Sequence, residues 1–556
     1  MKSSTLAAGA VLALLTVCGW LFFPGHTFLQ SDTQIYVPIL EHLRDASLYP
    51  SDPVALRPHV AYTIYDEMAL LLRKLSGQPF EFGLFLQQIV FRFCGLVGMY
   101  LIARAAACSV RMSLLVTGLF GLGATIAGPA VLIFEYEPVP RGYAVPLLIL
   151  SLGLVLHGRW RDGAIAAGVA VLYHPPTTAP VLLALLLLAV RRKQVRQLWP
   201  IAAAGLIAFA LSRIQAGIVE PQEFFSVVDP ALEKLQRLRG SYNWYTMWGA
   251  PWPRHYEFVA VLLAVAYARV RQQLPGDLRF LTGAIAIYGM VSIPVSHILM
   301  ERVKWSLMAQ FQPARAVLFV VLLTVTMAAL AAIHAAKAGN RSGAIESVAW
   351  FAVAFAVPAQ ADVSLLLFPD LRNETMQARF LVVMGLAVAA WLAARWDQLR
   401  PELAAGALTA ALLLPFWLMP GPGKVRNYPD LDHPEIHELA DWARTQTPVD
   451  AVFQFPDSGR DLTSGLFRVY ALRGVYVDWK SGGQVNLLRE FAMEWWDRWQ
   501  KAGGGEFDPA RATEHLRSLG GLGVDYAVVG AKHAVAGWEP VYQNARYVVY
   551  ALKKQP

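Results

Sequence analysis

Charged residues are scarce in this chain of 556 residues, where they make up 16% of the sequence. A soluble protein carries roughly 25% charged residues, so a wholly soluble globular fold is excluded. Long apolar runs recur instead between residue 6 and about residue 420, and each is near the ~17–25 residues that span a bilayer. The sequence therefore predicts a chain that crosses a membrane many times.

Cysteine is also rare, and its three positions exclude two kinds of site. Cys18, Cys94 and Cys108 lie in or beside apolar segments, and their spacing fits neither a disulfide framework nor a zinc site. The first apolar run, Leu6–Phe23, follows Lys2 as in a signal peptide, but no small-residue cleavage site comes after it. We interpret this run as an uncleaved first helix.

The net charge of +8 does not indicate a nucleic-acid partner. Residues 424–556 contain 16 Lys and Arg against 17 Asp and Glu, a net charge of −1. The positive excess therefore lies in the membrane part, where it concentrates in alternate loops such as those with Arg104, Arg159 and Arg191. Such loops face the cytoplasm, which predicts an N-terminus inside and a C-terminus outside.

The predicted fold class is a membrane all-α protein with about 13 transmembrane helices and a C-terminal soluble α/β domain. The expected domains are a polytopic part, 1–420, and an outer part, 421–556. The spans are expected at roughly 6–23, 83–103, 112–133, 142–157, 162–173, 177–190, 198–213, 256–270, 280–298, 314–334, 346–359, 379–394 and 402–419.

The first outer loop, 24–82, is long and has helical periodicity. Segments 33–44 and 60–75 predict two amphipathic helices that lie at the membrane interface. Asp32 stands just before the first of them, so it is a candidate for a helix N-cap as well as for chemistry. An aromatic run, Tyr242–Trp248, predicts either an interfacial belt or a stacking platform for a sugar or a lipid.

Several polar residues lie in or beside the expected spans and are further candidates for a site. Segment 162–173 is too short to cross a full bilayer, so His174, followed by two prolines, is expected inside a water-filled cavity or at a helix-ending turn. Arg92, four residues after Gln88, lies within a span and needs a partner, in a structural ion pair or in a functional site. Around the next helices, Arg302, Lys304 and Arg315 are candidates for holding the phosphate of a lipid carrier, or are headgroup anchors.

In the tail, short apolar strands alternate with helices. We expect a helix at 433–445 capped by Asp432, a second helix at 511–519, and strands at 451–455, within 468–479, at 526–529 and at 547–550. This alternation predicts an α/β sandwich.

The architecture resembles the glycosyltransferase-C superfamily: many helices, Asp32 in a long first outer loop, the pair Glu135–Glu137 in the second, and an outer α/β tail. The resemblance implies a catalytic role for Asp32 and matches Glu135-Tyr136-Glu137 to an acidic motif of that loop. The stretch from Glu137 through Arg141-Gly142 to Tyr173-His174-Pro175 also looks like uncharacterised bacterial members of this group.

The tail is similar to the outer domain of oligosaccharyltransferase catalytic subunits. In those enzymes a Trp-Trp-Asp motif that binds the acceptor sequon follows the strand, but here that place holds Phe455–Gly459. Trp495-Trp496-Asp497 comes about 40 residues later, where core or surface packing is the stronger interpretation. Transfer to a peptide sequon is therefore not expected.

A polyprenyl-phosphate sugar donor requires a groove between helices, basic residues for its phosphate, and a carboxylate base for the acceptor hydroxyl. Asp32 is the candidate base. Arg315, Arg302, Lys304, Arg141 and His174 are the candidate phosphate ligands. Glu135 and Glu137, two residues apart, are candidates for binding one Mg²⁺ or Mn²⁺, or they belong to a solvated loop.

The favoured function is an integral-membrane glycosyltransferase at the outer face of a bacterial inner membrane. Its expected partners are membrane lipid, a polyprenyl-phosphate sugar donor, and a glycan, lipid or protein acceptor. A transporter or flippase of a lipid-linked or polar solute is the alternative, with Arg92 and Gln88 as its first candidate site; it is weakened because no internal repeat is visible. A non-catalytic scaffold that acts through the tail is a third possibility.

Overall fold

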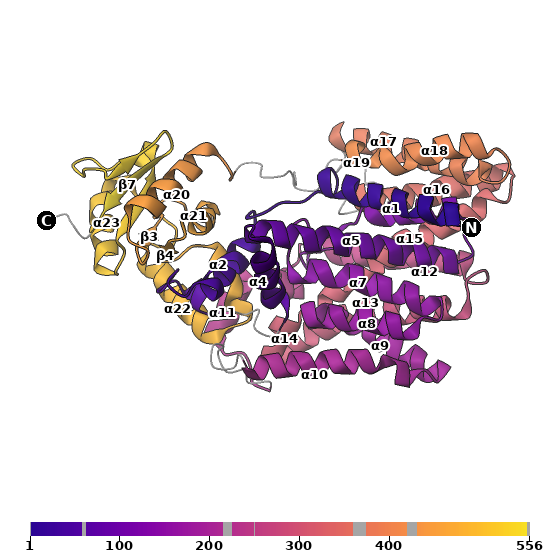
Figure 1. Cartoon of the computed structure of the whole chain (residues 1–556), viewed down its shortest axis with the longest axis horizontal. Helices are drawn as coiled ribbons and strands as arrows, with labels where there is room; N and C mark the ends of the chain where they lie inside the picture. The colour runs from indigo at the N-terminus through magenta and orange to yellow at the C-terminus, as the bar shows by residue number, and fades with distance from the viewer. Residues whose placement is uncertain are drawn as a thin grey trace.

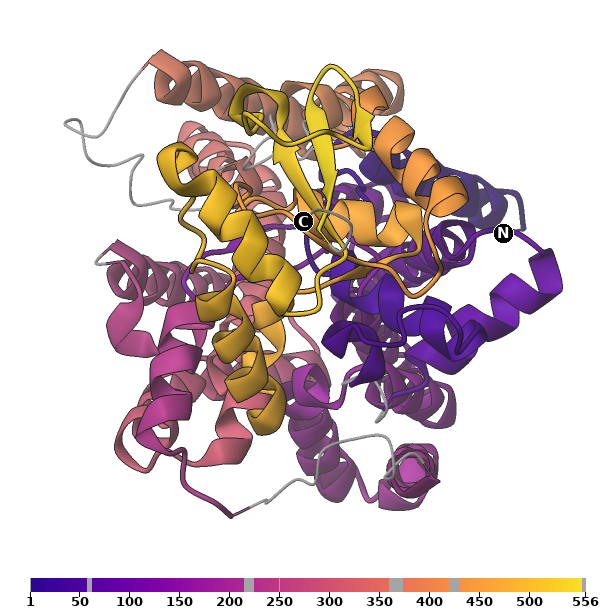
Figure 2. The same ribbon diagram turned by 90° about the vertical axis from the view of Figure 1, so that its left-hand side faces the viewer.

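The computed structural model describes residues 2–57, 63–214, 225–249, 251–359, 374–419 and 431–552. A bundle of long, roughly aligned helices forms most of the molecule, and a smaller α/β region lies at one end of it (Figures 1 and 2). The domain boundary predicted at 420/421 falls outside the described residues.

A helix lies in each of the thirteen ranges that hydropathy predicted. These helices are α1 (Lys2–Leu21), α5 (Phe80–Ala105), α6 (Val110–Gly121), α7 (Pro140–Leu156), α8 (Trp160–Tyr173), α9 (Pro175–Arg192), α10 (Trp199–Ile214), α12 (Pro251–Val270), α13 (Gly276–His297), α15 (Val317–Ala336), α16 (Arg341–Ala359), α17 (Glu374–Trp396) and α18 (Pro401–Leu413).

The described chain has the apolar helices of a multi-pass membrane protein. Six are long and apolar enough to cross a membrane, by length and composition: Phe80–Ala105, Val195–Ile214, Gly276–Arg302, Ser306–Ala336, Gln377–Trp396 and Pro401–Leu418. Leu6–Leu21, Val110–Gly121 and Pro140–Leu156 are shorter apolar helices. The number of crossings and the N-in, C-out orientation stay predictions.

The prediction of a helix through residue 133 was wrong in its length. Helix α6 ends at Gly121, and a small antiparallel hairpin follows, made of β1 (Thr125–Ile126) and β2 (Val131–Leu132). Gly123 and Gly128 adopt φ angles of 66° and 78°, which favour glycine and turn the chain back. The hairpin brings Leu132 next to the acidic loop that leads into α7.

Helix α15 is the core of the bundle and is buried along almost its whole length. It packs against α6, α12, α13 and α16. Thr324 and Thr326 satisfy their hydroxyls inside this apolar environment by donating to carbonyl oxygens four residues earlier. The position of Arg315, two residues before α15, is therefore fixed by the best-packed helix of the molecule.

Helices α5 and α7 approach closely because glycines line their contact. A Cβ atom on Gly98 would lie 2.5 Å from the carbonyl oxygen of Ile149, and one on Gly153 would lie 2.5 Å from the carbonyl oxygen of Gly98. Small residues allow such backbone contact between membrane helices. This contact sets α7, and with it Arg141, against α5.

Three helices of the first loop lie between the bundle and the C-terminal region: α2 (Thr33–Arg44), α3 (Pro53–Leu56) and α4 (Tyr65–Ser76) (Figure 1). The expected solvent-facing side of an amphipathic helix is largely missing from α2, since most of Thr33–Glu41 is buried. The reason is that α2 packs against both α4 and the C-terminal region.

The other short elements connect these parts. They are η1 (Val195–Leu198), α11 (Pro230–Arg239), η2 (Ser241–Asn243), η3 (Tyr245–Met247), the π-helical turn η4 (Ile298–Arg302), α14 (Ser306–Phe311), η5 (Pro313–Ala316) and α19 (Pro415–Leu418).

The C-terminal region contains a five-stranded sheet in the order β4-β3-β5-β7-β6. Its strands are β3 (Val452–Gln454), β4 (Gly474–Val475), β5 (Tyr526–Gly530), β6 (Tyr542–Gln543) and β7 (Tyr547–Ala551). Strand β3 is parallel to β4 and β5, whereas β7 is antiparallel to β5 and β6. The helical elements are α20 (Pro434–Gln446), α21 (Thr463–Ala471), η9 (Lys480–Asn486), α22 (Arg489–Lys501), η10 (Pro509–Arg511), α23 (Ala512–Gly521) and η11 (Ala531–His533).

One local prediction in this region was wrong. The side chain that caps α20 is that of His433, which accepts from the backbone N–H of Ile436, and not that of Asp432. The strand predicted within 468–479 is confirmed by β4, whereas Arg468 itself lies in α21, which buries a helical face against α2 and α20. Trp495 lies in α22 and is buried in the core, as the packing interpretation predicted.

A buried ion-pair cluster ties the C-terminal region to the first loop. Arg468 pairs with Asp52 at 2.7 Å and also with Asp478. All three side chains are at most 2% exposed, so both carboxylates neutralise one guanidinium out of contact with water. This cluster holds the segment after β4 in place, and that segment leads directly to Lys480.

Candidate functional site

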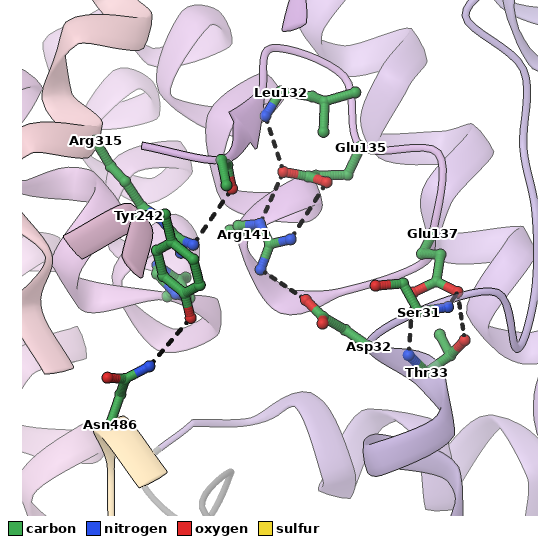
Figure 3. A network of polar contacts seen from close by, with 12 residues as sticks. Ser31, Asp32, Thr33, Leu132, Glu135, Glu137, Arg141, Tyr242, Arg315 and Asn486 are labelled. Carbon is green, nitrogen blue, oxygen red and sulfur yellow. Dashed lines mark hydrogen bonds and ion pairs between the residues drawn. The ribbon is translucent and has the colours of Figure 1, made fainter. Parts of the chain in front are cut away.

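Asp32 lies between two cations that come from different parts of the molecule. Its Oδ2 accepts from a guanidinium nitrogen of Arg141 at 3.1 Å (Figure 3). Its Oδ1 accepts from Nζ of Lys480 at 2.6 Å. Arg141 stands in the first turn of α7, and Lys480 begins η9 in the C-terminal region. The three side chains are 15–26% exposed, so a ligand can reach them.

The side chain of Glu137 supplies the cap of α2 that was expected from Asp32. Its carboxylate accepts from the backbone N–H of Thr33 at 3.1 Å and from the Thr33 hydroxyl at 2.9 Å (Figure 3). It also accepts from the backbone N–H groups of Gln30 and Ser31 at 2.8 and 2.6 Å. A carboxylate is stabilised there by the unpaired N–H groups and the helix dipole. Asp32 stands at the N-cap position of α2, as predicted, but its side chain makes no cap bond, so its carboxylate is left to the two cations.

Glu135 orients Arg141. Its Oε1 accepts from Nε of Arg141 at 2.7 Å and from the backbone N–H of Leu132 at 3.1 Å. A Cβ on Gly142 would lie 2.9 Å from the Cβ of Glu135, so the absence of a side chain there lets the acidic loop pack onto α7. The guanidinium of Arg141 therefore bridges Glu135 and Asp32.

The two glutamates have different partners and point apart in Figure 3, Glu135 toward Arg141 and Glu137 toward the start of α2. Within the described ranges, no group of three or more His, Cys, Asp or Glu residues could hold a metal ion. The divalent cation predicted for this pair stays a prediction, and the contacts seen here give each carboxylate a separate structural role.

Arg315 is a third cation in the same neighbourhood. It donates to the carbonyl oxygens of Pro129 and Ala130 at 3.1 and 3.3 Å, and its guanidinium carbon lies 5.0 Å from the ring centre of Tyr242. It forms no ion pair with a carboxylate among the residues that the structure describes. Arg315 is thus held by dipoles and a π-face, which leaves its charge available to an anion.

His174 and Arg315, two of the candidate phosphate ligands, line one narrow groove. His174 caps α9, since its Nδ1 accepts from the backbone N–H of Thr177. The rest of the groove is mostly apolar, with Pro180, Phe311 and Phe319, and holds only about 10 Å³ of open space. The groove therefore carries two basic side chains, His174 and Arg315, while the rest of its wall is mostly apolar.

Arg302 and Lys304 are not brought to this site. Lys304 pairs with Glu233 of α11 at 2.7 Å, and Arg302 is exposed. Among the described residues, neither side chain forms a hydrogen bond or ion pair with Asp32, Arg141 or Arg315. Their predicted role as phosphate ligands thus has no support from the geometry.

Lys480 is the residue that sequence reasoning missed. It follows β4, whose carboxyl end lies beside that of β3 because the two strands are parallel. Ligand sites form at such edges of parallel sheets. A lysine after a short apolar strand, in Asp478-Trp479-Lys480, was the available signal, but its partner is 448 residues away in the sequence.

The surroundings of Asp32 set its charge. Burial would raise its pKa, but the positive charges of Lys480 and Arg141 and their hydrogen bonds outweigh burial and hold the pKa well below its usual range. Burial raises the pKa of Glu137, and the negative charge of Asp32 adds to this effect. Asp32 is therefore ionised in the free protein and is a weak base while both cations remain in place.

Arg92 and Gln88 have structural partners. Arg92 donates to the carbonyl oxygens of Gly19, Gly25 and Glu135 at 3.2, 2.8 and 2.7 Å. Gln88 donates to the carbonyl of the same Glu135. Among the described residues, the partners of Arg92 are therefore backbone carbonyls and not the carboxylate of the predicted ion pair, and these contacts shape the acidic loop.

Comparisons with known proteins give distant matches. Residues 434–502 match a family described as a domain of unknown function, DUF6798. No curated protein matches the chain. The structure is similar to ArnT from Cupriavidus metallidurans in the apo state at 13% identity, with a TM-score of 0.39, 99% of this chain and 98% of that chain covered.

Two further solved structures are similar. One is the arabinofuranosyltransferase AftD from Mycobacteria, at 15% identity and a TM-score of 0.43, with 99% of this chain but 40% of that chain covered. The other is the Archaeoglobus fulgidus oligosaccharyltransferase tethered with an acceptor peptide, at 12% identity and a TM-score of 0.39, covering 94% and 69%.

Proposed function

We propose that this chain is an integral-membrane glycosyltransferase. It transfers a hexosyl or pentosyl group from a polyprenyl-phosphate-type lipid donor to an acceptor hydroxyl. The reaction takes place at the outer face of a bacterial inner membrane, with the C-terminal region in the periplasm. The observation that carries this proposal is the arrangement of Asp32 between Arg141 and Lys480, beside Arg315 at the basic end of an apolar groove.

This arrangement fits a lipid phosphate better than a free anion. The apolar side chains that line the groove would contact an isoprenoid chain once the groove opens beyond its present volume of about 10 Å³, and the presence of Arg315 and His174 in the same lining supports a phosphate beside them. Arg315 presents a planar guanidinium without a competing carboxylate, which suits a phosphate oxygen. Arg141 and Lys480 supply further positive charge within the same cluster.

Donor binding would activate Asp32. A phosphate that shares Arg141 and Lys480 weakens their hold on the carboxylate, so the pKa of Asp32 rises toward a value useful for a base. Asp32 then accepts the proton of the acceptor hydroxyl as its oxygen attacks the anomeric carbon. The bond between that carbon and the phosphate oxygen breaks, and the polyprenyl phosphate leaves with its charge stabilised by the cations.

Glu135 and Glu137 act in this scheme as positioning residues, because Glu135 orients Arg141 and Glu137 fixes the start of α2 next to Asp32. A divalent cation at the two glutamates is a separate proposal. It requires that excess chelator abolish transfer and that Mg²⁺ or Mn²⁺ restore it; transfer that persists in chelator would exclude it.

The deciding experiment replaces Asp32 by Asn and measures transfer by mass spectrometry of the glycans made by a deletion strain. Loss of the base is expected to lower the rate by about 10²–10⁴-fold. Asp45→Asn is the matched control, since Asp45 is the C-cap of the same helix and its carboxylate accepts from the backbone N–H and hydroxyl of Ser47, at the opposite end of α2 from Asp32. Unchanged glycans with normal expression of Asp32→Asn would remove Asp32 from catalysis.

A transporter is the less favoured alternative. Its candidate site, Arg92 with Gln88, is committed to the backbone carbonyl of Glu135 in the acidic loop. Nothing else in the described bundle favours a solute site at mid-membrane depth.

A further inference from the structure

The aromatic run Tyr242–Trp248 lies against other parts of the protein. The side chain of Trp244 is fully buried and that of Trp248 is 8% exposed. The two expectations for this run, an interfacial belt and a stacking platform, therefore do not hold for these two indoles. Tyr242 is partly exposed and lies beside Arg315, so its role is a different one (Figure 3).

Trp248 joins the aromatic run to the hairpin that contacts Arg315. Its Nε1 donates to the backbone carbonyl oxygen of Tyr242 at 2.9 Å. Its ring packs on the hairpin turn, where a Cβ on Gly128 would lie 3.1 Å from Cδ2 of the indole. The next two carbonyl oxygens of that turn accept from Arg315. Trp248 thus holds Tyr242 and the hairpin turn together around one guanidinium.

The ring of Tyr242 is also held at its hydroxyl end. The hydroxyl accepts from Nδ2 of Asn486 at 3.2 Å, and the guanidinium carbon of Arg315 lies 5.0 Å from the ring centre (Figure 3). A ring fixed at both ends favours one position of the guanidinium, because a cation is attracted to the π-face. Two nitrogens of Arg315 donate to backbone carbonyls, so the direction of its remaining N–H groups is then set. A defined direction is what a phosphate contact by arginine requires.

Asn486 belongs to the same short helix of the C-terminal region as Lys480. Lys480 is the first residue of η9 and Asn486 is the last. Nζ of Lys480 donates to Asp32 at 2.6 Å. Gly240 permits the contact at the other end, because a Cβ there would lie 2.4 Å from Nδ2 of Asn486. One end of η9 therefore contacts Asp32, and the other end contacts the tyrosine that supports Arg315.

We infer that Tyr242 and Asn486 are positioning residues for the donor phosphate, through which the C-terminal region sets the orientation of Arg315. This inference rests on the proposed glycosyl transfer. The docking of η9 then prepares the phosphate contact and the base together. The π-face of Tyr242 contributes most of the effect, and the hydrogen bond from Asn486 contributes the rest by fixing the ring.

The test measures binding of a lipid phosphate without transfer, so that it stands apart from the test of the proposed function. Full-length protein in detergent is titrated by calorimetry with farnesyl phosphate, and with farnesol to measure the contribution of the hydrocarbon chain alone. The variants are Tyr242→Leu, which removes the π-face, and Tyr242→Phe, which keeps the face and removes the hydroxyl. Tyr267→Leu is the matched control, since Tyr267 is also partly exposed but its hydroxyl donates to the carbonyl of Arg279, away from the site.

We expect farnesyl phosphate to bind Tyr242→Leu about threefold to tenfold more weakly than wild type, and Tyr242→Phe about twofold more weakly. Binding of farnesol should be the same in all variants, because the tyrosine acts on the phosphate contact. Tyr267→Leu should bind both ligands as wild type does. A tyrosine with only a structural role would lower the melting temperature and leave the preference for farnesyl phosphate over farnesol unchanged.

Asn486→Leu covers the case in which Tyr242→Leu does not fold, and it tests the link to η9. It removes the donor to the Tyr242 hydroxyl at similar volume, so it should weaken binding as much as Tyr242→Phe does. The double variant should bind no more weakly than either single variant, because both lack the same hydrogen bond.

Arg315→Ala is the reference for loss of the phosphate contact. If Arg315→Ala loses the preference for farnesyl phosphate while Tyr242→Phe and Asn486→Leu bind as wild type does, the inference is overturned and the donor site stands. If wild type does not prefer farnesyl phosphate to farnesol, the inference and the proposed donor site are both overturned.

Discussion

Arg92 in the helical bundle and Arg468 in the C-terminal region are both buried, yet they are neutralised in different ways. Arg92 donates to three backbone carbonyls and has no carboxylate partner among the described residues. Arg468 is held by the carboxylates of Asp52 and Asp478. The bundle thus uses a cation to shape a loop, whereas the C-terminal region uses ion pairs to join two distant segments.

The difference explains how the two halves of the site are built. Arg92 fixes the carbonyl of Glu135, and the side chain of Glu135 orients Arg141. Arg468 fixes Asp478, two residues before Lys480. Asp32 is therefore held by one cation positioned by the bundle and by one positioned through the docking of the C-terminal region.

Replacing Arg468 by Met should have the largest effect on stability. It leaves two carboxylates buried without a counter-charge, which costs about 3–5 kcal/mol. We expect a large fall in melting temperature, and faster proteolysis between the bundle and the C-terminal region. Arg444→Met is the control, because its pair with Asp441 is 50% and 66% exposed and should contribute at most about 1 kcal/mol. Equal effects of the two substitutions would refute the role given to the buried cluster.

Replacing Lys480 by Met tests whether the C-terminal region takes part in the reaction or only in docking. Loss of a charged hydrogen bond of about 1.5–3 kcal/mol predicts a loss of kcat/KM by about 10–150-fold. Little change in melting temperature is expected, since Lys480 is partly exposed. The measurement is donor-dependent transfer by purified protein, with Lys501→Met, an exposed lysine of α22, as the control. Transfer at the wild-type rate would confine the site to the bundle.

Replacing Gly98 by Ala tests the helical half of the comparison. The added Cβ meets the backbone of Ile149, which cannot move without shifting α7, so a loss of about 1–3 kcal/mol is expected. Gly9 on α1 has no atom within 4 Å of an added Cβ, so Gly9→Ala should be neutral or stabilising. Thermal unfolding of both variants in the same detergent checks this. If Gly98→Ala unfolds at the same temperature as wild type, α5 and α7 can move apart enough to admit the added methyl group without loss of stability.

Much of this architecture follows from the sequence, because hydropathy and periodicity are local signals. They located the thirteen long helices, although α6 ends at Gly121, before Gly123 and Gly128 turn the chain. The short helices α11 and α14 fell in stretches that were predicted as loops. The excess of Lys and Arg in alternate loops predicted that Asp32 and the loop of Glu135 and Glu137 lie on the same side of the membrane. The hydrogen bonds from the backbone N–H groups of Gln30 and Ser31 to Glu137 show that these two loops are in contact.

Other features of the site depend on contacts that no local signal carries. Lys480 reaches Asp32 only after the C-terminal region has docked through Arg468. Glu137 displaces Asp32 as the cap of α2 because its loop approaches the helix end from another part of the chain. Lys304 was grouped with Arg315 by proximity in sequence, but its partner, Glu233, lies on α11. Tertiary packing decided each of these assignments.

The smallest expected effect is a displacement between two pH profiles. In the free protein Lys480 and Arg141 keep the pKa of Asp32 low, so the acid limb of kcat/KM, which reports the free enzyme, should lie at low pH. In the donor complex the phosphate shares these cations, so the pKa of Asp32 rises and the acid limb of kcat moves to higher pH. Each unit of displacement corresponds to about 1.4 kcal/mol of weakened ion pairing.

The direction in which the acid limb of kcat/KM moves tests the role of Lys480. Lys480→Met should raise the acid limb of kcat/KM toward that of kcat, because the pKa of Asp32 in the free protein is no longer held down by the lysine. Lys501→Met should leave both profiles unchanged. If the acid limbs of kcat and kcat/KM coincide in wild type, donor binding does not release Asp32, and the base must lie elsewhere. An acid limb of kcat at lower pH than the acid limb of kcat/KM would mean that donor binding strengthens the ion pairs of Asp32. That result would contradict a phosphate shared by Arg141 and Lys480.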